Sequence, residues 1–374
     1  MTKRSEPPFR ADQVGSLLRP PELMAMRKRH EAGEATAAEL HGVEDKCIRE
    51  AVAMQEEIGF EAVTDGEFRR GGFHTDFMRQ IGNVTFEFLQ GRADVGQDRG
   101  RKRTLPPLTA VVTGPMSLPP GGIEVDNFKF LKSVAKALPK VCIPSPTMTH
   151  FRGGREAIDK NAYPEMSDFF ADLARIYREQ VAALAEAGCR YVQLDDTNLA
   201  YLCDAQMREG VKAIGEDPEE LPRTYAALIN DSIRDRPADM KVCIHLCRGN
   251  SSSSWYAEGG YEPVADALFN LTDVDGFFLE YDDERSGDFA PLRFVPKGKI
   301  VVLGLISSKR AAMENPDDLK RRIDEAAKYM PLDQLCLSPQ CGFQSSTRGA
   351  NDINVEQEKA KLKLVVDVAA QVWN

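Results

Sequence analysis

The chain has 374 residues, of which 42% are hydrophobic and 28% are charged, as is usual for a globular protein. Its formal net charge of −10 argues against polyanionic partners, namely nucleic acid and anionic membranes. The N-terminus has no apolar segment and no stretch approaches a membrane-spanning helix, so we expect a cytoplasmic protein. No linker or shift of composition indicates a second unit. We therefore predict one domain over residues 1–374, and the oligomeric state is left open.

Short apolar runs recur along the chain, and most of them close on polar residues and lead into a helical stretch. Continuous apolar runs are typical of parallel strands that are covered on both faces. We predict strands over Phe9–Gly15, Ala62–Asp65, Val141–Pro144, Tyr191–Leu194, Lys241–Leu246, Gly276–Leu279, Ile300–Leu305 and Gln334–Leu337.

Local signals mark the helices between these strands. Thr36 and Glu39 have the spacing of a capping box, and Gly59 marks the end of the helix that follows. Pro218 and Pro316 lie near the first turn of two further helices. We predict helices over residues 36–57, 165–186, 218–234, 316–329 and 355–372.

Eight strands that alternate with helices predict an α/β fold of the (β/α)8 TIM-barrel type. The runs Thr85–Leu89 and Leu108–Thr113 have the pattern of an antiparallel pair, which predicts a β-hairpin inserted after the second strand. An open doubly wound sheet is the alternative fold. No Gly-x-Gly-x-x-Gly turn follows the first strand to support it.

The eight cysteines are expected to be thiols or metal ligands in a reducing compartment. Cys142, Cys189, Cys243 and Cys336 lie in or beside apolar runs, where cysteine acts as a small buried hydrophobic residue. Cys247 and Cys341 instead follow strand ends among glycine, serine and proline.

The strand Lys241–Leu246 ends in a pattern that suits metal binding. His245 and Cys247 are separated by one residue, so their side chains point the same way from an extended chain. Glu280 and Cys341 end or follow two later strands, at the barrel end where such folds carry their active sites. One imidazole, two thiolates and a carboxylate form a ligand set suited to Zn²⁺. Structural packing is the alternative for the His245–Cys247 pair alone.

The charge of this ligand set indicates the chemistry. Two thiolates and one carboxylate would leave a Zn²⁺ site with about one negative charge. Such a site acidifies water poorly but keeps a bound sulfur electron-rich. We therefore predict thiol activation for alkyl transfer rather than hydrolysis.

Other rim residues suit an amino-acid substrate. Glu67 and Asp195 are predicted catalytic and substrate-binding residues that hold an ammonium group, with an internal ion pair to Arg69 or Arg70 as the alternative. Ser16 could bind a carboxylate or serve only in a turn. The Ser/Gly-rich loop 250–260 is predicted to be a lid that carries Trp255 over the metal as a substrate contact. The basic run Arg99–Arg103 is predicted to be a solvated loop.

At these residues the chain resembles the C-terminal catalytic barrel of cobalamin-independent methionine synthase, in its short stand-alone form. The matching segments span nearly the whole chain: residues 10–16 (Arg-Ala-Asp-Gln-Val-Gly-Ser), 64–68 (Thr-Asp-Gly-Glu-Phe), 193–195 (Gln-Leu-Asp), 245–247 (His-Leu-Cys), 279–280 (Leu-Glu) and 338–342 (Ser-Pro-Gln-Cys-Gly).

The resemblance implies that His245, Cys247, Glu280 and Cys341 bind zinc and that Ser16, Glu67 and Asp195 contact homocysteine. It implies methyl transfer from a 5-methyltetrahydrofolate to the zinc-bound thiolate of homocysteine, as in a 5-methyltetrahydropteroyltriglutamate–homocysteine S-methyltransferase. The family stacks a tryptophan on the folate after the third strand, where this chain has the stretch Thr147–Phe151. His150 or Phe151 would take its place, and His150 is predicted to bind the donor. The long enzymes carry a histidine after the seventh strand, where this chain has Ser307, Ser308 and Lys309.

Two alternatives remain open from the sequence. Zinc alkyltransferases of the same superfamily join other thiols to other electrophiles, for example coenzyme M to epoxides, and would not need Glu67 and Asp195 as an ammonium clamp. A non-catalytic zinc-storing barrel would leave the acidic rim unexplained.

Overall fold

The computed structural model describes residues 4–88, 108–249, 254–344 and 352–373. The basic run Arg99–Arg103 lies outside these residues, as does part of the serine-rich loop. The strands are β1 (Ala62–Val63), β2 (Gly82–Phe88), β3 (Leu108–Ser117), β4 (Leu138–Pro139), β5 (Val141–Pro144), β6 (Tyr191–Asp196), β7 (Lys241–Leu246), β8 (Gly276–Glu280), β9 (Ile300–Ile306) and β10 (Leu335–Pro339).

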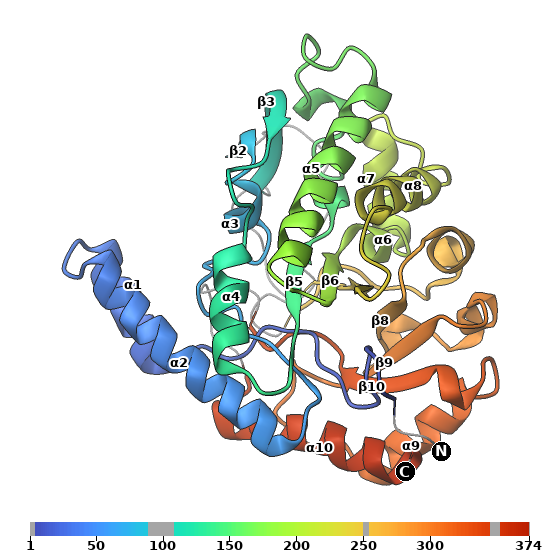
Figure 1. Cartoon of the computed structure of the whole chain (residues 1–374). Coiled ribbons are helices and arrows are strands. Elements are labelled where there is room, and N and C mark those ends of the chain that lie inside the picture. The colour runs from blue at the N-terminus through green and yellow to red at the C-terminus, as the bar shows by residue number, and fades with distance from the viewer. Residues whose placement is uncertain (1–3, 89–107, 250–253, 345–351, 374) are drawn as a thin grey trace.

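The strands form a parallel barrel with helices outside it (Figure 1). β5 to β10 pair in sequence order in one sheet, and β1 pairs with β4 just before β5. A parallel bridge from Ala11 to Leu337 brings the N-terminal segment against β10. The side chains of β5 to β10 are almost all buried, because both faces of a parallel sheet are covered. The predicted (β/α)8 fold is confirmed.

The first predicted strand, Phe9–Gly15, is wrong as a regular strand, since Ala11 alone makes a bridge there. The backbone of Arg10 and Asp12 bonds to Leu337 of β10, while side chains satisfy much of the remaining backbone of this segment. Asp12 accepts from the backbone N–H of Phe9, and Gln193 donates to the carbonyl of Val14. The second strand also ends two residues early, because the chain turns at Gly66 and Glu67, both with positive φ.

The helices outside the barrel are α1 (Pro21–Glu31), α2 (Ala37–Ile58), α3 (Thr75–Met78), α4 (Val125–Val134), α5 (Met166–Glu186), α6 (Asn198–Tyr201), α7 (Ala205–Ala213), α8 (Leu221–Ile233), α9 (Pro316–Ala326) and α10 (Val355–Trp373). Short 3-10 turns cover Pro146–Thr149, Gly154–Ala157, Glu262–Val264, Glu284–Ser286, Ala290–Phe294 and Leu332–Gln334, and Asp266–Leu271 forms a π-helical turn.

All five predicted helices are present, with ends shifted by up to three residues. The predicted capping box is confirmed: Thr36 accepts from the backbone N–H of Glu39, and the Glu39 side chain accepts from that of Thr36. Gly59 ends α2 in the left-handed region with φ 107°. The helices α1, α3, α4, α6 and α7 were not predicted. α1 is mostly exposed and lacks the one-sided apolar pattern that identifies a helix in a sequence.

The predicted hairpin after the second strand is confirmed. β2 and β3 pair antiparallel, with Val84 opposite Val112 and Phe86 opposite Ala110. Figure 1 shows this pair beside α3, away from α10, which packs against β10. The hairpin therefore adds to the barrel without interrupting its strand order.

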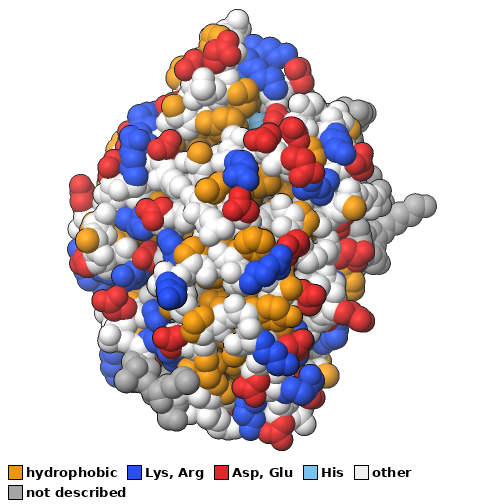
Figure 2. Space-filling model, turned by 90° about the vertical axis from the view of Figure 1, so that its right-hand side faces the viewer, with side chains coloured by type: hydrophobic (Ala, Val, Ile, Leu, Met, Phe, Trp, Pro, Cys, Tyr) orange, Lys and Arg blue, Asp and Glu red, His pale blue; other side chains and the backbone are white. Residues whose placement is uncertain are grey.

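The surface in Figure 2 carries acidic and basic side chains interspersed over one face. Many are paired, as in the exposed ion pair of Arg293 with Glu262. Among the helices of the described residues, none is both long enough and apolar enough to cross a membrane.

Candidate metal centre

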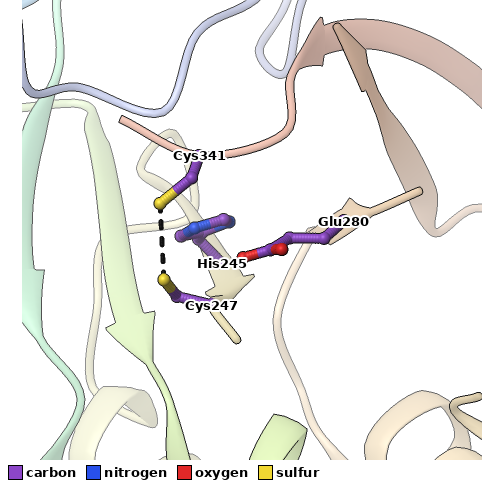
Figure 3. Close-up of side chains that lie close together, drawn as sticks. All are labelled: His245, Cys247, Glu280 and Cys341. Atoms are coloured by element: carbon purple, nitrogen blue, oxygen red, sulfur yellow. Dashed lines mark hydrogen bonds between the residues drawn. The ribbon is translucent and has the colours of Figure 1, made fainter. Parts of the chain in front are cut away.

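Four side chains meet at the carboxyl ends of β7, β8 and β10 (Figure 3). His245 lies in β7 and Cys247 follows that strand, Glu280 is the last residue of β8, and Cys341 lies two residues beyond β10. One ligand atom of each lies within 4.8 Å of those of the other three, and all four residues are buried. The structure thus brings together the four residues predicted as metal ligands.

The donor atoms are free to take a metal ion. The sulfurs of Cys247 and Cys341 lie 3.3 Å apart as free thiols. Nδ1 of His245 faces the carbonyl of Phe278 at 3.3 Å, which orients the ring. Nε2 of His245 is buried and has no hydrogen-bond partner among the described residues. A histidine whose other nitrogen is held by a carbonyl is the usual arrangement of a metal ligand, so these residues fit zinc.

Glu280 is held by several hydrogen bonds. Its Oε1 accepts from the backbone N–H of Arg248 at 2.8 Å, and its Oε2 accepts from the Arg285 guanidinium at 3.0 Å. The Tyr261 hydroxyl accepts from the Glu280 N–H at 2.9 Å and lies 3.2 Å from the Glu280 carbonyl, to which it donates. These contacts fix the direction in which the carboxylate faces the other ligands.

The thiol pair has unequal acidities. The hydrogen bond with Cys341 lowers the pKa of Cys247 to about 6, against the opposing effect of burial. The same hydrogen bond and burial raise the pKa of Cys341 well above its usual value, while the Lys309 ammonium acts in the opposite direction. Burial acts to lower the pKa of His245, but Cys247, Asp195 and Glu280 outweigh it and raise that pKa. These shifts favour a thiolate at Cys247 that is hydrogen-bonded to a thiol at Cys341.

A second buried group contains the two predicted clamp residues. Glu67, Asp195 and the thiol of Cys142 each place a ligand atom within 4.8 Å of those of the other two. Burial raises the pKa of Glu67 to about 7 and that of Asp195 to about 6. Two buried carboxyl groups this close repel each other when both are ionised, and a bound cation would relieve that repulsion.

An internal ion pair with Arg69 or Arg70 was the predicted alternative to an ammonium clamp at Glu67 and Asp195. This ion pair is present in part. Arg70 lies 3.7 Å from Oε2 of Glu67 and 3.0 Å from Glu124, whereas Arg69 pairs with Asp45. Oε2 of Glu67 is nevertheless buried without a hydrogen-bond partner among the described residues. Glu67 also has φ 60°, a conformation unusual for a non-glycine residue and often found at functional positions.

Ser16 joins this second group to the metal ligands. Its carbonyl accepts from the backbone N–H of Phe343, two residues after Cys341, at 2.9 Å. A side chain at Gly342 would collide with the Ser16 hydroxyl, so glycine is required for this approach. Likewise, a side chain at Gly15 would collide with the sulfur of Cys142.

Trp255 lies on the outer side of Glu280. Its ring packs against the Arg285 guanidinium, with 5.3 Å from Cζ to the ring centroid. Both line an open cavity of about 730 Å³ together with Asp283, Glu284 and Arg310. Trp255 therefore contacts Arg285, which in turn binds the predicted ligand Glu280.

The structure does not bring His150 into either group. Its Nδ1 lies 3.0 Å from the Tyr225 hydroxyl and its Nε2 lies 3.2 Å from Glu216. The ring also packs against Phe169 and Phe170 of α5. His150 thus occupies the layer between the barrel and its outer helices.

Several buried residues around the centre were missed from the sequence. Arg248 and Lys309 lie beside the metal ligands, and Arg285 contacts one of them. Arg248 follows Cys247 directly in the sequence. This adjacency to a predicted ligand is the one sequence feature that indicates that Arg248 lies near the centre. Cys142 was predicted only as a buried hydrophobic residue, because its strand reads as continuously apolar.

Comparison with known proteins agrees with this geometry. Residues 9–371 match the family model of the cobalamin-independent synthase catalytic domain. The Bacillus subtilis (strain 168) protein YxjH, described as uncharacterized, is 44% identical over 99% of this chain and 96% of its own length. A Listeria monocytogenes protein provisionally assigned as a vitamin-B12-independent methionine synthase has a solved structure that is 36% identical, with a TM-score of 0.78 over 99% of this chain and all of that one.

A B12-independent methionine synthase from Shewanella sp. W3-18-1, solved in complex with selenomethionine, has the same fold. It is 19% identical, with a TM-score of 0.69 and 96% of each chain covered. The family match covers almost the full length and includes every segment that carries the two buried groups. The chain therefore belongs to the cobalamin-independent methionine synthase family of methyltransferases, as a match to its catalytic domain.

Proposed function

We propose that the protein is a zinc-dependent methyltransferase that moves a methyl group from a 5-methyltetrahydrofolate-type donor to the sulfur of homocysteine, giving methionine. The observation that carries this proposal is the adjacency of the two buried groups. Asp195 of β6 lies directly opposite His245 of β7 in the parallel register. A short amino-acid thiol can therefore place its sulfur at the metal ligands and its ammonium at the carboxyl pair.

Each group has a distinct role in this proposal. His245, Cys247, Glu280 and Cys341 hold zinc, which supplies a site where a thiol binds as the nucleophilic thiolate. Glu67 and Asp195 bind the substrate ammonium, and their ionised forms are stabilised by its charge. Ser16 stands between the two groups and is the candidate contact for the substrate carboxylate. Trp255 borders the cavity next to Glu280 and is the candidate contact for the donor.

The reaction balances without an oxidant or reductant. A carbon–sulfur bond forms as the methyl–nitrogen bond of the donor breaks, and the thiol proton is matched by protonation of the departing nitrogen. The selenomethionine complex of the Shewanella enzyme supports a product of this kind for the fold. Transfer to another thiol, such as coenzyme M, is less well supported because such a thiol lacks the ammonium that Glu67 and Asp195 suit.

The proposal is tested by metal analysis and a methyl-transfer assay on the purified full chain. We expect one tightly bound zinc per chain, proton release when homocysteine binds, and methionine formation with methyltetrahydrofolate or its polyglutamate. Coenzyme M serves as the competing acceptor and methylcobalamin as the competing donor. Absence of bound zinc, or preference for coenzyme M over homocysteine, would contradict the proposal.

A further inference from the structure

Two buried cations beside the metal centre have no carboxylate partner among the described residues. Arg248 is 0% exposed, and none of its three guanidinium nitrogens makes a hydrogen bond there. Its Cζ stacks over the Tyr261 ring at 4.5 Å. Lys309 is 3% exposed, and its Nζ donates to the carbonyl of Gly249 at 2.9 Å.

Both cations are fixed to the segment that carries Cys247. Arg248 is the next residue, and its backbone N–H binds the Glu280 carboxylate at 2.8 Å. The backbone N–H of Gly249 donates to the sulfur of Cys247 at 3.3 Å, while its carbonyl takes the Lys309 ammonium. One positive charge therefore belongs to the segment that carries Cys247, and the other, which follows β9, is hydrogen-bonded to that segment.

The nearby arginines of the cavity differ from this pair, because their charges are already matched. Arg285 binds Asp282 at 2.6 Å as well as Asp283, and Arg310 also binds Asp283. The guanidinium groups of Arg285 and Arg310 are thus balanced by two carboxylates, Asp282 and Asp283, that are not among the predicted metal ligands. Arg248 and Lys309 have no such partners, and their charges remain to be balanced.

An uncompensated buried charge is costly, so a buried cation indicates a nearby anion. Two thiolates and a carboxylate on a dication leave about one negative charge, and a substrate thiolate would make about two. Two buried cations therefore balance the charge of the centre with a bound substrate thiolate, which is about two negative charges. They exceed the charge of the centre without that thiolate, which is about one.

We propose that Arg248 and Lys309 are positioning residues whose fixed charges stabilise the centre when its substrate sulfur is bound as a thiolate. This inference rests on the proposed function, because it assumes that a thiol binds at the four ligands. The two residues act through the electric field at the sulfur and do not touch the reacting atoms. Their effect should consequently depend on the charge of the sulfur ligand.

Homocysteine and methionine separate this charge effect from a packing effect. Both present the same ammonium and carboxylate, but homocysteine binds through a thiolate and methionine carries a neutral thioether. Loss of a neighbouring positive charge weakens the binding of an anionic ligand and leaves the binding of a neutral ligand almost unchanged. A general disturbance of the site would weaken both.

The experiment is calorimetric binding of homocysteine and of methionine to the zinc-loaded full chain. The variants are Arg248→Met and Lys309→Met, which remove the charge and keep an unbranched chain, and Lys309→Arg, which keeps the charge. We expect each Met variant to weaken homocysteine binding about tenfold and to change methionine binding less than twofold. Lys309→Arg should bind homocysteine within about threefold of the unaltered protein.

The outcomes distinguish this inference from the proposed function. If the unaltered zinc-loaded protein binds neither amino acid, the proposed function itself fails. If it binds both and Lys309→Met weakens both equally, or weakens neither, the charge role is overturned while the proposed function stands. Methionine binding also verifies that the site of each variant is folded, and Lys309→Met decides the question if Arg248→Met does not fold.

Discussion

Asp195 and His245 lie opposite one another on the neighbouring parallel strands β6 and β7. Asp195 belongs to the carboxyl pair with Glu67, and His245 belongs to the four metal ligands. In the proposed function, this pairing places the site for the substrate ammonium beside the site for the metal and its sulfur ligand. In this proposal, the spacing of the two strands sets the distance between the sites for the ammonium group and the sulfur of the substrate.

Replacement of a thiol ligand should remove the metal without unfolding the barrel. We expect Cys341→Ser to reduce zinc affinity at least about a hundredfold, because a hydroxyl replaces a thiolate in the ligand set. The measurement is a chelator competition at neutral pH. Cys336→Ser is the matched control, since Cys336 is a buried thiol of β10, the strand that leads to Cys341, and lies outside the cluster. Equal loss of zinc in both variants would contradict the ligand assignment.

Removal of one clamp charge should affect substrates that carry an ammonium. We expect Asp195→Asn and Glu67→Gln each to weaken homocysteine binding about 10- to 100-fold, the range for loss of a hydrogen bond to a charged group. Binding of 4-mercaptobutyrate, which has the thiol and carboxylate but no amino group, should change little. Calorimetry on the zinc-loaded chain measures both. A parallel loss for the two thiols would argue against an ammonium clamp.

Arg285 should support the metal through Glu280, whereas Arg310 should not. Both guanidinium groups bind Asp283, but Arg285 alone of the two also binds Glu280, at 3.0 Å. Loss of a group that orients a ligand typically lowers metal affinity about 10- to 100-fold. We expect that loss in Arg285→Met and no change in Arg310→Met. Chelator competition compares them, and similar affinities in the two variants would exclude this role.

His150 should matter for stability rather than for substrate binding. Its two nitrogens face Tyr225 and Glu216 within a buried aromatic layer. We expect His150→Phe to lower the free energy of unfolding by about 1–3 kcal/mol, because the Tyr225 hydroxyl loses its partner. The KM for the methyl donor should stay the same. A raised KM with unchanged stability would instead restore the prediction from the sequence that His150 binds the donor.

The stability of the fold should fall as pH rises, through Glu358 of α10. Burial raises the pKa of this carboxyl group to about 8, although it accepts the backbone N–H of Leu18 at 2.8 Å. The folded state therefore holds a proton that the unfolded state releases near pH 4.5. Its contribution to stability is fully present below pH 4.5 and is lost as pH rises toward 8, a change on the order of 3–5 kcal/mol.

Denaturant unfolding between pH 5 and pH 8.5 measures this slope. Glu358→Gln keeps the shape and the hydrogen-bond acceptor but cannot ionise, so the slope between about pH 7 and pH 8 should largely disappear. The raised pKa values of Glu67 and Asp195 leave a slope below about pH 7 in both proteins. Glu356→Gln is the control, because Glu356 is exposed on the same helix. An unchanged slope in Glu358→Gln would show that another group dominates.

The sequence was sufficient to predict the barrel and the grouping of the four candidate ligands for a physical reason. Parallel strands must be apolar on both faces, so they stand out as short continuous runs, and their carboxyl ends share one rim. This placed His245 and Cys247 near Glu280 and Cys341 before any contact was known. The segment Phe9–Gly15 was misread as a strand because its apolar residues are buried, yet side chains rather than a neighbouring strand satisfy much of its backbone.

The tertiary structure alone decided which polar side chains face one another. His150 follows a strand end like the ligands, but its ring packs between α5 and α8. Arg248 and Lys309 look like ordinary polar residues in the sequence. They become buried cations only when β7 and β9 pack on either side of β8 in the folded barrel. Burial and pairing depend on contacts between residues distant in the chain. A local pattern can therefore predict strands and ligand types, while the charge balance around the site depends on the packed fold.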